Sequence, residues 1–121
     1  MFADSDFIFA LIKESDWLKN NAGKIFEKYK GNIKISISVI IELALVCKKF
    51  NMECVEMFSN LFQLFETDEG TREITMRAAI YIDKHKLNVF DAFHASFAFK
   101  DKIISSDSIY EIVGLERVKL E

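Results

Sequence analysis

Four acidic residues of this sequence lie where the apolar pattern changes from a predicted strand to a predicted helix. They are Asp4, Glu42, Asp91 and Asp107. Asp4 and Asp107 follow short apolar strands, whereas Glu42 and Asp91 lie in the first turns of predicted helices. In an open parallel sheet, the carboxyl ends of the strands form the edge where ligands bind. We therefore expect the four carboxylates to converge at that edge.

Carboxylates gathered in this way could support metal-dependent hydrolysis of a phosphodiester. Their negative charges repel one another, so such a cluster needs cations or protons. Hard divalent ions such as Mg²⁺ and Mn²⁺ bind oxygen ligands of this kind. Two such ions can hold a phosphodiester, activate a water molecule and stabilise the leaving oxygen.

Helix capping is a second interpretation of the same acids. Aspartate and glutamate are favoured at helix N-termini whatever the function. Asn88 and Asp91 have the spacing of a capping box, and Asp107 could be an ordinary N-cap. Glu42 fits this interpretation less well, because its neighbours in 39–46 are all apolar and a buried charge is unfavourable unless paired. Asp4 also fits less well, since aspartate is a poor strand residue.

The apolar periodicity predicts the elements that position these acids. The predicted strands are Met1–Asp4, Ile33–Val39, Leu64–Glu66, Lys102–Ile104 and Arg117–Leu120. The predicted helices are Phe7–Lys13, Ser15–Tyr29, Val39–Phe50, Met52–Leu64, one from Asp68 or Thr71 to Lys86, Asn88–Phe99, and a turn between Ser105–Asp107 and Gly114. Strands that alternate with helices predict an α/β fold with a parallel sheet covered on both faces.

The composition limits the class of protein. The 121 residues are 50% hydrophobic and 29% charged, with a formal net charge of −3, which predicts one domain over residues 1–121 and excludes a disordered chain. No apolar run approaches the roughly 18 residues of a membrane span, and no secretion signal is recognisable. The two cysteines, Cys47 and Cys54, form no CxxC motif, so we expect a cytoplasmic protein with buried thiols. The weak net charge excludes a histone-like coat for nucleic acid but not a nuclease.

Four segments resemble the motifs of PIN-domain ribonucleases of the VapC-like toxin type, in the order and approximate spacing of that family. They are Phe2–Asp6, Ser38–Leu43, Leu87–Ala95 and Ile104–Asp107. The closing segment Gly114–Val118 also resembles the last turn and strand of the family. Each segment is weakly specific alone, whereas four in this order, over essentially the whole chain, are fairly specific.

The resemblance implies a three-layer α/β/α sandwich with a mostly parallel sheet of four to five strands. It also implies an endoribonuclease that depends on Mg²⁺ or Mn²⁺, acts on RNA, and is paired with an antitoxin as in a toxin–antitoxin system. The catalytic metal ligands would be Asp4, Glu42, Asp91 and Asp107. Ser5 and Ser106 would support this acid cluster, and Asp6, in place of the commoner asparagine, would add a negative charge near it.

Two other functions compete with this one. A non-catalytic PIN-like module that binds a partner would keep the fold without the chemistry. A phosphatase of the haloacid dehalogenase type would also place two aspartates after its first strand, as in Asp4-Ser5-Asp6. That class would need a late acidic pair, which this sequence lacks, and it would leave Glu42 unexplained.

Two further features bear on partners and on the site. The stripe Phe58, Leu61, Phe62 and Phe65 predicts core packing, but part of it could remain exposed and support a homodimer. His94 lies on a helical face similar to that of Asp91, where a packing histidine is the favoured interpretation and a role in the site the alternative.

Overall fold

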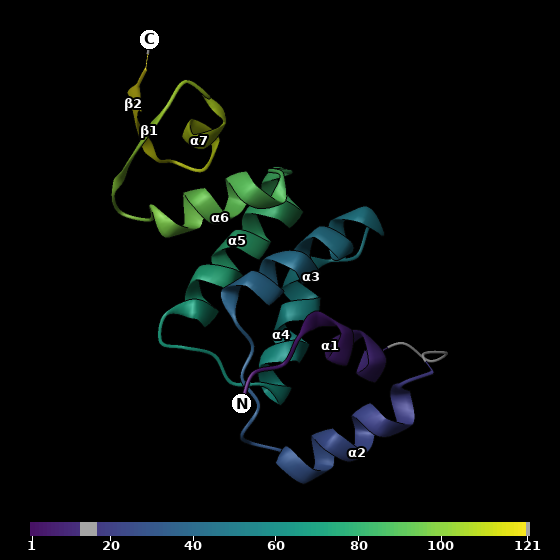
Figure 1. Ribbon diagram of the computed structural model, residues 1–121. Coiled ribbons are helices and arrows are strands. Elements are labelled where there is room, and N and C mark those ends of the chain that lie inside the picture. Colours follow the sequence, from purple (N-terminus) through teal and green to yellow (C-terminus); the bar gives the residue numbers. More distant parts are fainter. Residues whose placement is uncertain (13–16, 121) are drawn as a thin grey trace.

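A computed structural model describes residues 1–12 and 17–120 of the protein (Figure 1). Its helices are α1 (Ser5–Ile12), α2 (Lys19–Tyr29), α3 (Ile37–Lys49), α4 (Cys54–Leu64), α5 (Thr71–His85), α6 (Val89–Phe97) and α7 (Ile109–Ile112). Its strands are β1 (Lys102–Ser105) and β2 (Glu116–Lys119). The predicted helix boundaries at Lys13 and Ser15, and the chain end at Glu121, lie outside the described residues. Among the described residues, no helix is long and apolar enough to cross a membrane.

The helices α3 to α6 pack together and form the core. Helix α5 lies between α4 and α6, and α3 contacts both α4 and α6 (Figure 1). Each helix buries apolar side chains at helical spacing, such as Ile40 and Leu43 of α3 and Ala92 and Phe93 of α6. The thiols of Cys47 and Cys54 are buried in this core, as expected from the sequence.

The phenylalanine stripe of α4 belongs to the core and not to a dimer surface. Phe58, Leu61, Phe62 and Phe65 are all buried, and α4 packs mainly against α5. The expectation that this helix supports a homodimer is therefore wrong for this stripe. The physical reason is that α5 packs against α4, while Phe7 of α1 and Phe26 of α2 contact the ring of Phe65, all within the same chain.

The strands form two separate parallel groups. In the first, Lys34 pairs with Phe2 on one side and with Glu66 on the other. In the second, β1 pairs with β2, with Ile103 opposite Arg117 and Ile104 opposite Val118. The parallel pairing agrees with the predicted α/β class, and β1 and β2 lie close to their predicted positions.

One sheet of four to five strands between two helical layers does not form among the described residues, because the two groups are not joined. In addition, the predicted strand Ile33–Val39 is wrong beyond its first half, since α3 already begins at Ile37. Ser36 is the N-cap of α3, and its Oγ accepts a hydrogen bond from the backbone N–H of Val39 at 3.3 Å. This local capping interaction overrides the strand preference of the β-branched residues.

A carboxylate of α5 caps the N-terminus of α4. Asp83 Oδ1 accepts a hydrogen bond from the backbone N–H of Cys54 at 3.0 Å, and Oδ2 accepts one from Val55 at 2.9 Å. Glu53, the local N-cap residue, makes no side-chain capping hydrogen bond. The capping is therefore tertiary, and it combines a charge-assisted hydrogen bond with the favourable field of the helix N-terminus.

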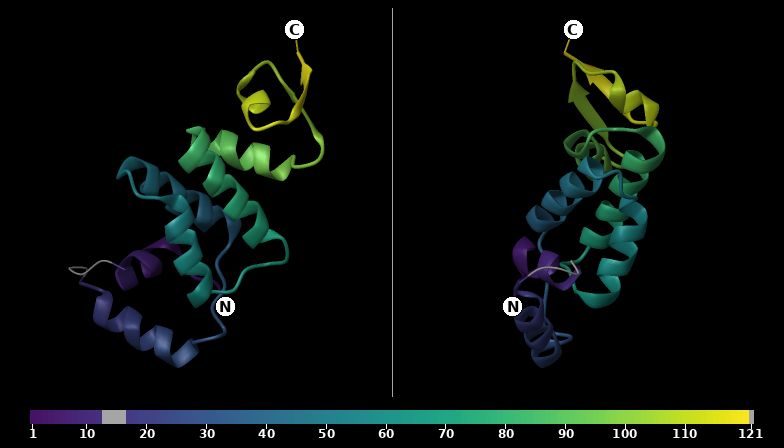
Figure 2. Two further views of the ribbon diagram at one scale, coloured as in Figure 1. Left: turned by 180° about the vertical axis from the view of Figure 1, so that it is seen from behind. Right: turned by 90° about the vertical axis from the view of Figure 1, so that its right-hand side faces the viewer.

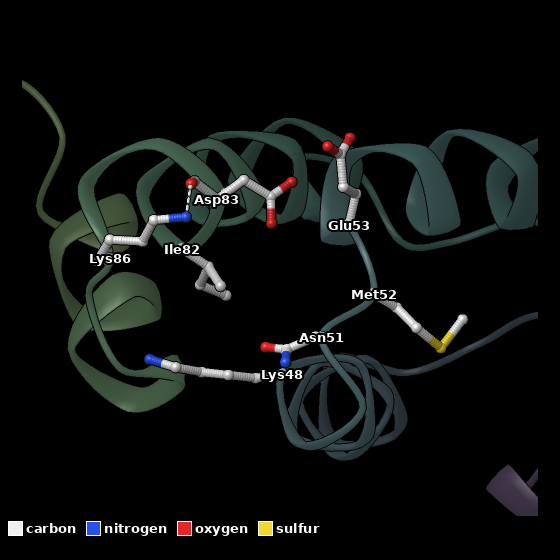
Figure 3. A pocket seen from close by; sticks show the side chains of 7 residues that line it. All are labelled: Lys48, Asn51, Met52, Glu53, Ile82, Asp83 and Lys86. Atoms are coloured by element: carbon white, nitrogen blue, oxygen red, sulfur yellow. Dashed lines mark hydrogen bonds between the residues drawn. The ribbon is translucent and has the colours of Figure 1, made fainter.

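A cavity of about 290 Å³ lies beside this cap (Figure 3). It is lined by Lys48, Asn51, Met52, Glu53, Ile82, Asp83 and Lys86. The ammonium group of Lys48 donates to the carbonyl of Leu87, and that of Lys86 donates to the carbonyl of Asp83, each at 2.8 Å. Lys48, Asp83 and Lys86 thus already have hydrogen-bonding partners at or beside helix ends, which gives this part of the cavity a structural role.

We predict that Asp83→Ala lowers the free energy of unfolding by about 1 to 3 kcal/mol, because two backbone donors of α4 lose their acceptor. Urea unfolding followed by circular dichroism would measure the change. Asp68→Ala is the matched control, since Asp68 is exposed and its contact with Lys34 is a long 3.8 Å surface ion pair. Equal stability of the two variants would contradict the capping role.

Candidate active site

The structure brings Asp4, Ser5 and Glu42 together. Ser5 is the first residue of α1 and directly follows the paired segment around Phe2. Its hydroxyl donates a hydrogen bond to Glu42 Oε2 at 2.7 Å and lies 3.4 Å from Asp4 Oδ1. The backbone N–H of Ser5 also donates to Asp4 Oδ1 at 2.7 Å. One buried serine therefore links two carboxylates that come from distant parts of the chain.

Both carboxylates of this cluster are open to solvent. Asp4 and Glu42 are exposed, whereas Ser5 is only 8% exposed. Neither carboxylate forms an ion pair with another described residue. Two neighbouring negative charges without a cation, with oxygen atoms accessible from solvent, fit the oxygen donors that a hard divalent ion prefers.

Glu42 differs from its sequence-based prediction in two respects. It lies in the second turn of α3 and not the first, because the helix begins at Ile37. Its side chain is exposed, while Ile40, Leu43 and Ala44 point into the core. The expected penalty of burying this charge therefore does not arise, and Ser5 partners the carboxylate at the protein surface.

Asp91 links α6 to the C-terminal part of the chain. Its Oδ2 accepts a hydrogen bond from Asn88 Nδ2 at 2.7 Å, and its backbone N–H donates to Asn88 Oδ1 at 2.8 Å. Its Oδ1 accepts a hydrogen bond from the hydroxyl of Tyr110 at 3.1 Å. The N-cap role of Asn88 predicted from the sequence is confirmed here. The carboxylate of Asp91 accepts from the side chain of Asn88 and not from its backbone N–H, as a capping box would require, and it also holds α7 against α6.

Asp107 and Ser106 lie on the other strand group, apart from the Asp4–Glu42 pair. Asp107 Oδ1 accepts a hydrogen bond from the backbone N–H of Ile109 at 2.9 Å, so this carboxylate stabilises the start of α7. Ser106 is exposed beside it, and Asp6 is exposed in the first turn of α1. His94 is exposed on α6, so the expectation that it packs in the core is wrong.

The two pairs of acids do not converge in the described part of the chain, where no three histidine, cysteine or acidic side chains are close enough to hold a metal ion. The reason lies in the arrangement of the strands. Asp4 follows the strand group around Phe2, whereas Asp107 follows β1 in the other group. In every view the segment β1–α7–β2 lies beyond α6, away from the N-terminus (Figures 1 and 2).

The sequence profile of the PIN domain family matches residues 1–114. The chain belongs to the PIN domain family. This confirms the resemblance that the four motifs suggested and the α/β class of the fold. A solved structure described as a toxin-antitoxin complex from Klebsiella pneumoniae is similar to this PIN domain, with 17% identity and a TM-score of 0.43. The similarity covers 88% of this chain and 86% of that one. A comparison with curated proteins gave no match.

The acids of this PIN domain thus fall into two kinds of environment. Asp4 and Glu42 share a serine hydroxyl and otherwise face solvent, while Asp91 and Asp107 accept hydrogen bonds at the starts of helices. The first pair keeps its carboxylate oxygens open to solvent, and the second pair already has hydrogen-bonding partners within the chain. Sequence spacing could not distinguish these environments, because strand-end and helix-start acids look alike in sequence.

The contact between Asp91 and Tyr110 generates a prediction about pH. Burial of Tyr110, together with the nearby carboxylate of Asp91, raises the pKa of Tyr110 to about 12. We expect Asp91→Asn to lower the pKa of Tyr110, while burial keeps it above the usual value of about 10. Ultraviolet titration of tyrosinate would measure the pKa, with Tyr110→Phe used to subtract the other two tyrosines. Identical titrations of Asp91→Asn and wild type would contradict the contact.

The same contact fixes the direction of a stability change. The folded protein holds the Tyr110 proton more tightly than the unfolded chain does. The stabilisation is therefore complete below the unfolded pKa of about 10 and is lost as pH rises toward about 12. Wild type should lose more stability than Tyr110→Phe over this interval, as measured by urea unfolding.

Proposed function

We propose that this PIN domain is a metal-dependent endoribonuclease that hydrolyses RNA phosphodiesters. The observation that carries the proposal is the Ser5 hydroxyl, which holds the exposed carboxylates of Asp4 and Glu42 side by side. The chain belongs to the PIN domain family, and Asp4, Ser5 and Glu42 lie in the segments that resemble the motifs of PIN-domain ribonucleases. Both observations support a nuclease. Mg²⁺ or Mn²⁺ is the proposed cofactor, since both ions favour carboxylate oxygens.

The residues of the chain have distinct roles in this proposal. Asp4 and Glu42 would hold the ion, and Ser5 would orient Glu42 by donating its proton to Oε2. Asp91 and Asp107 would be the remaining acids of the site once they are brought to it, with Ser106 and Asp6 in supporting positions. A bound divalent ion would supply an activated water and charge stabilisation for the leaving oxygen.

We also propose that the protein acts as the toxin of a VapBC-type toxin–antitoxin pair in the cytoplasm. The antitoxin partner rests on the resemblance of the four motifs to VapC-like toxins. The two buried free thiols suit a reducing compartment. A homodimer is part of the same proposal and rests on the same resemblance.

A non-catalytic PIN-like module that binds a partner is the second candidate function. Asp91 and Asp107 favour it, because both already accept hydrogen bonds that stabilise helix starts. Metal-dependent RNA cleavage that Asp4→Asn abolishes would exclude this alternative. RNA that stays intact with every divalent ion tested would support it.

We predict that Asp4→Asn and Glu42→Gln abolish RNA cleavage while the fold is retained, because each removes one of the two open carboxylates. Ser5→Ala should reduce cleavage by roughly 10- to 100-fold, since it frees Glu42 without removing a ligand. Purified variants would be assayed on a structured RNA with Mg²⁺ or Mn²⁺, and circular dichroism would verify folding. Asp68→Asn is the control, as an exposed acid outside the cluster. Wild-type rates in all three variants would refute the assignment.

We further predict that millimolar Mn²⁺ raises the melting temperature of wild type and that EDTA reverses the shift. The reason is that a ligand which binds only the folded state stabilises it by mass action. Asp4→Asn and Glu42→Gln should shrink the shift, whereas Asp68→Asn should keep it. If wild type melted at one temperature with and without Mn²⁺, the two carboxylates would not form a metal site.

A further inference from the structure

A groove lies between α3 and α6, two helices that pack against each other. Its volume is about 540 Å³, within the range of roughly 300 to 1,000 Å³ that small-ligand sites occupy. We name it the Leu45–Phe90 groove. The roles proposed above for Asp4 and Glu42 leave this groove unused. It is lined by Leu45, Lys48, Lys49, Asn88, Val89, Phe90 and Asp91.

One exposed face of α3 connects this groove with the acidic cluster. Glu42, Leu45 and Lys49 are spaced by three and four residues, so they lie on the same face of the helix, and all three are exposed. Seven residues of an α-helix span about 10 Å. Successive phosphates of a stacked strand advance by about 3.4 Å, so this span corresponds to roughly three nucleotides. A strand whose phosphodiester lies at Glu42 can therefore continue along α3 into the groove.

Two ammonium groups give the groove a positive charge. Lys48 donates to the carbonyl of Leu87 at 2.8 Å, and the ammonium nitrogen of Lys49 lies 5.7 Å from the ring centre of Phe50. Both partners are uncharged, and neither lysine forms an ion pair with a described residue. Against these two cations, the lining residues include one carboxylate, that of Asp91. The groove is therefore complementary in charge to a polyanion such as a nucleic-acid strand.

Phe90 presents an aromatic ring to the groove from α6. Phe90 is 54% exposed, and Leu45, which lines the groove from α3, is 43% exposed. The preceding Val89 is buried, and the backbone N–H of Asp91 donates to Asn88 Oδ1 at 2.8 Å. The backbone that carries the ring is thus held in place before any ligand binds, which lowers the entropic cost of binding. Bases of single-stranded nucleic acids stack on exposed aromatic rings of this kind.

We propose that the Leu45–Phe90 groove binds unpaired nucleotides of RNA close to the bond that is cleaved. A base would stack on the ring of Phe90, Leu45 would contact the same nucleotide, and the ammonium group of Lys49 would bind a phosphate. The exposed ring accounts for the base and the unpaired lysine charges account for the backbone, so both parts of a nucleotide find a complementary group.

This inference rests on the proposed nuclease function and adds the class of RNA on which it acts. In a duplex, each base is stacked between its neighbours and is not available to a protein ring, whereas the bases of loops and single strands are. A groove that binds RNA through Phe90 therefore selects unpaired nucleotides. Because stacking tolerates every base, we expect little dependence on base identity at this position.

Binding of RNA without cleavage tests the stacking contact. A fluorescein-labelled single-stranded RNA would be titrated with protein in EDTA, and fluorescence anisotropy would give the Kd. We expect Phe90→Ala to weaken binding roughly 5- to 150-fold, Phe90→Leu to weaken it as well, and Phe90→Tyr to retain it, because only tyrosine keeps an aromatic face. Phe97→Ala is the matched control, since Phe97 is 59% exposed at the other end of α6. Wild-type affinity in Phe90→Ala or Phe90→Leu, or no binding by wild type, would overturn the proposal.

Salt dependence and a duplex test the other two parts of the proposal. Lys49→Ala should reduce the slope of log K against log salt by about 0.7, the value for one phosphate contact with a single strand. Lys24→Ala, at an exposed lysine of α2, should leave the slope unchanged. A duplex of the same sequence should bind more weakly and with no effect of Phe90→Ala. An unchanged slope in Lys49→Ala, or a duplex that binds as tightly as the single strand, would contradict the groove.

The groove and the nuclease function fail in different ways. A wild type that cleaves no RNA but binds it through Phe90 and Lys49 would refute the nuclease function and leave the groove supported. Cleavage that requires Asp4 and Glu42, with kcat/KM unchanged by Phe90→Ala, would keep the nuclease and overturn the groove. Light scattering that shows a dimer for wild type and a monomer for Phe90→Ala would assign the groove to a second copy of the chain, and this result would also overturn the proposal.

Discussion

The packing of α6 against α5 determines where the second half of this PIN domain can lie. The buried hydroxyl of Ser96 donates to the carbonyl of Ile74 at 2.6 Å, and Arg77 donates to the carbonyl of Ser96 at 3.0 Å. Separating the helices would leave buried polar groups without partners, which is strongly unfavourable. Because β1 begins a short turn after α6, the direction of this helix also sets the position of the C-terminal strands. The division of the sheet into two groups follows from this constraint.

Because the sheet is divided into two strand groups, the four acidic residues lie in two different environments. Asp107 accepts a backbone hydrogen bond at the start of α7, whereas the carboxylate of Asp91 accepts hydrogen bonds from the side chains of Asn88 and Tyr110. Asp4 and Glu42 meet one another through a serine hydroxyl and keep oxygen atoms open to solvent. The chemistry that a carboxylate can support is therefore set by which donors the tertiary structure places around it.

Local features of this protein could be predicted from the sequence with good accuracy. The helices Cys54–Leu64 and Thr71–His85, the capping by Asn88 and the strands near the C-terminus all depend on interactions within a few residues. The motif segments were sufficient to identify the family, because residue type and order carry that information. The proximity of Asp4 and Glu42 was expected from the same motifs. In the structure, the hydroxyl of Ser5 lies between the two carboxylates and contacts both.

The tertiary structure alone decided the remaining features. Ile33–Val39 has the alternation of a strand, yet its second half is helical, because α3 packs the side chains of Val39, Ile40 and Leu43 into the core. The exposure of Glu42 depends on which face of α3 meets the core. Whether Asp107 reaches Asp4 depends on the orientation of the helices between them. Sequence spacing predicts interactions between residues that are close along the chain. The pairing of distant strands depends on how every helix and strand between them packs, and this packing is determined only when the chain folds.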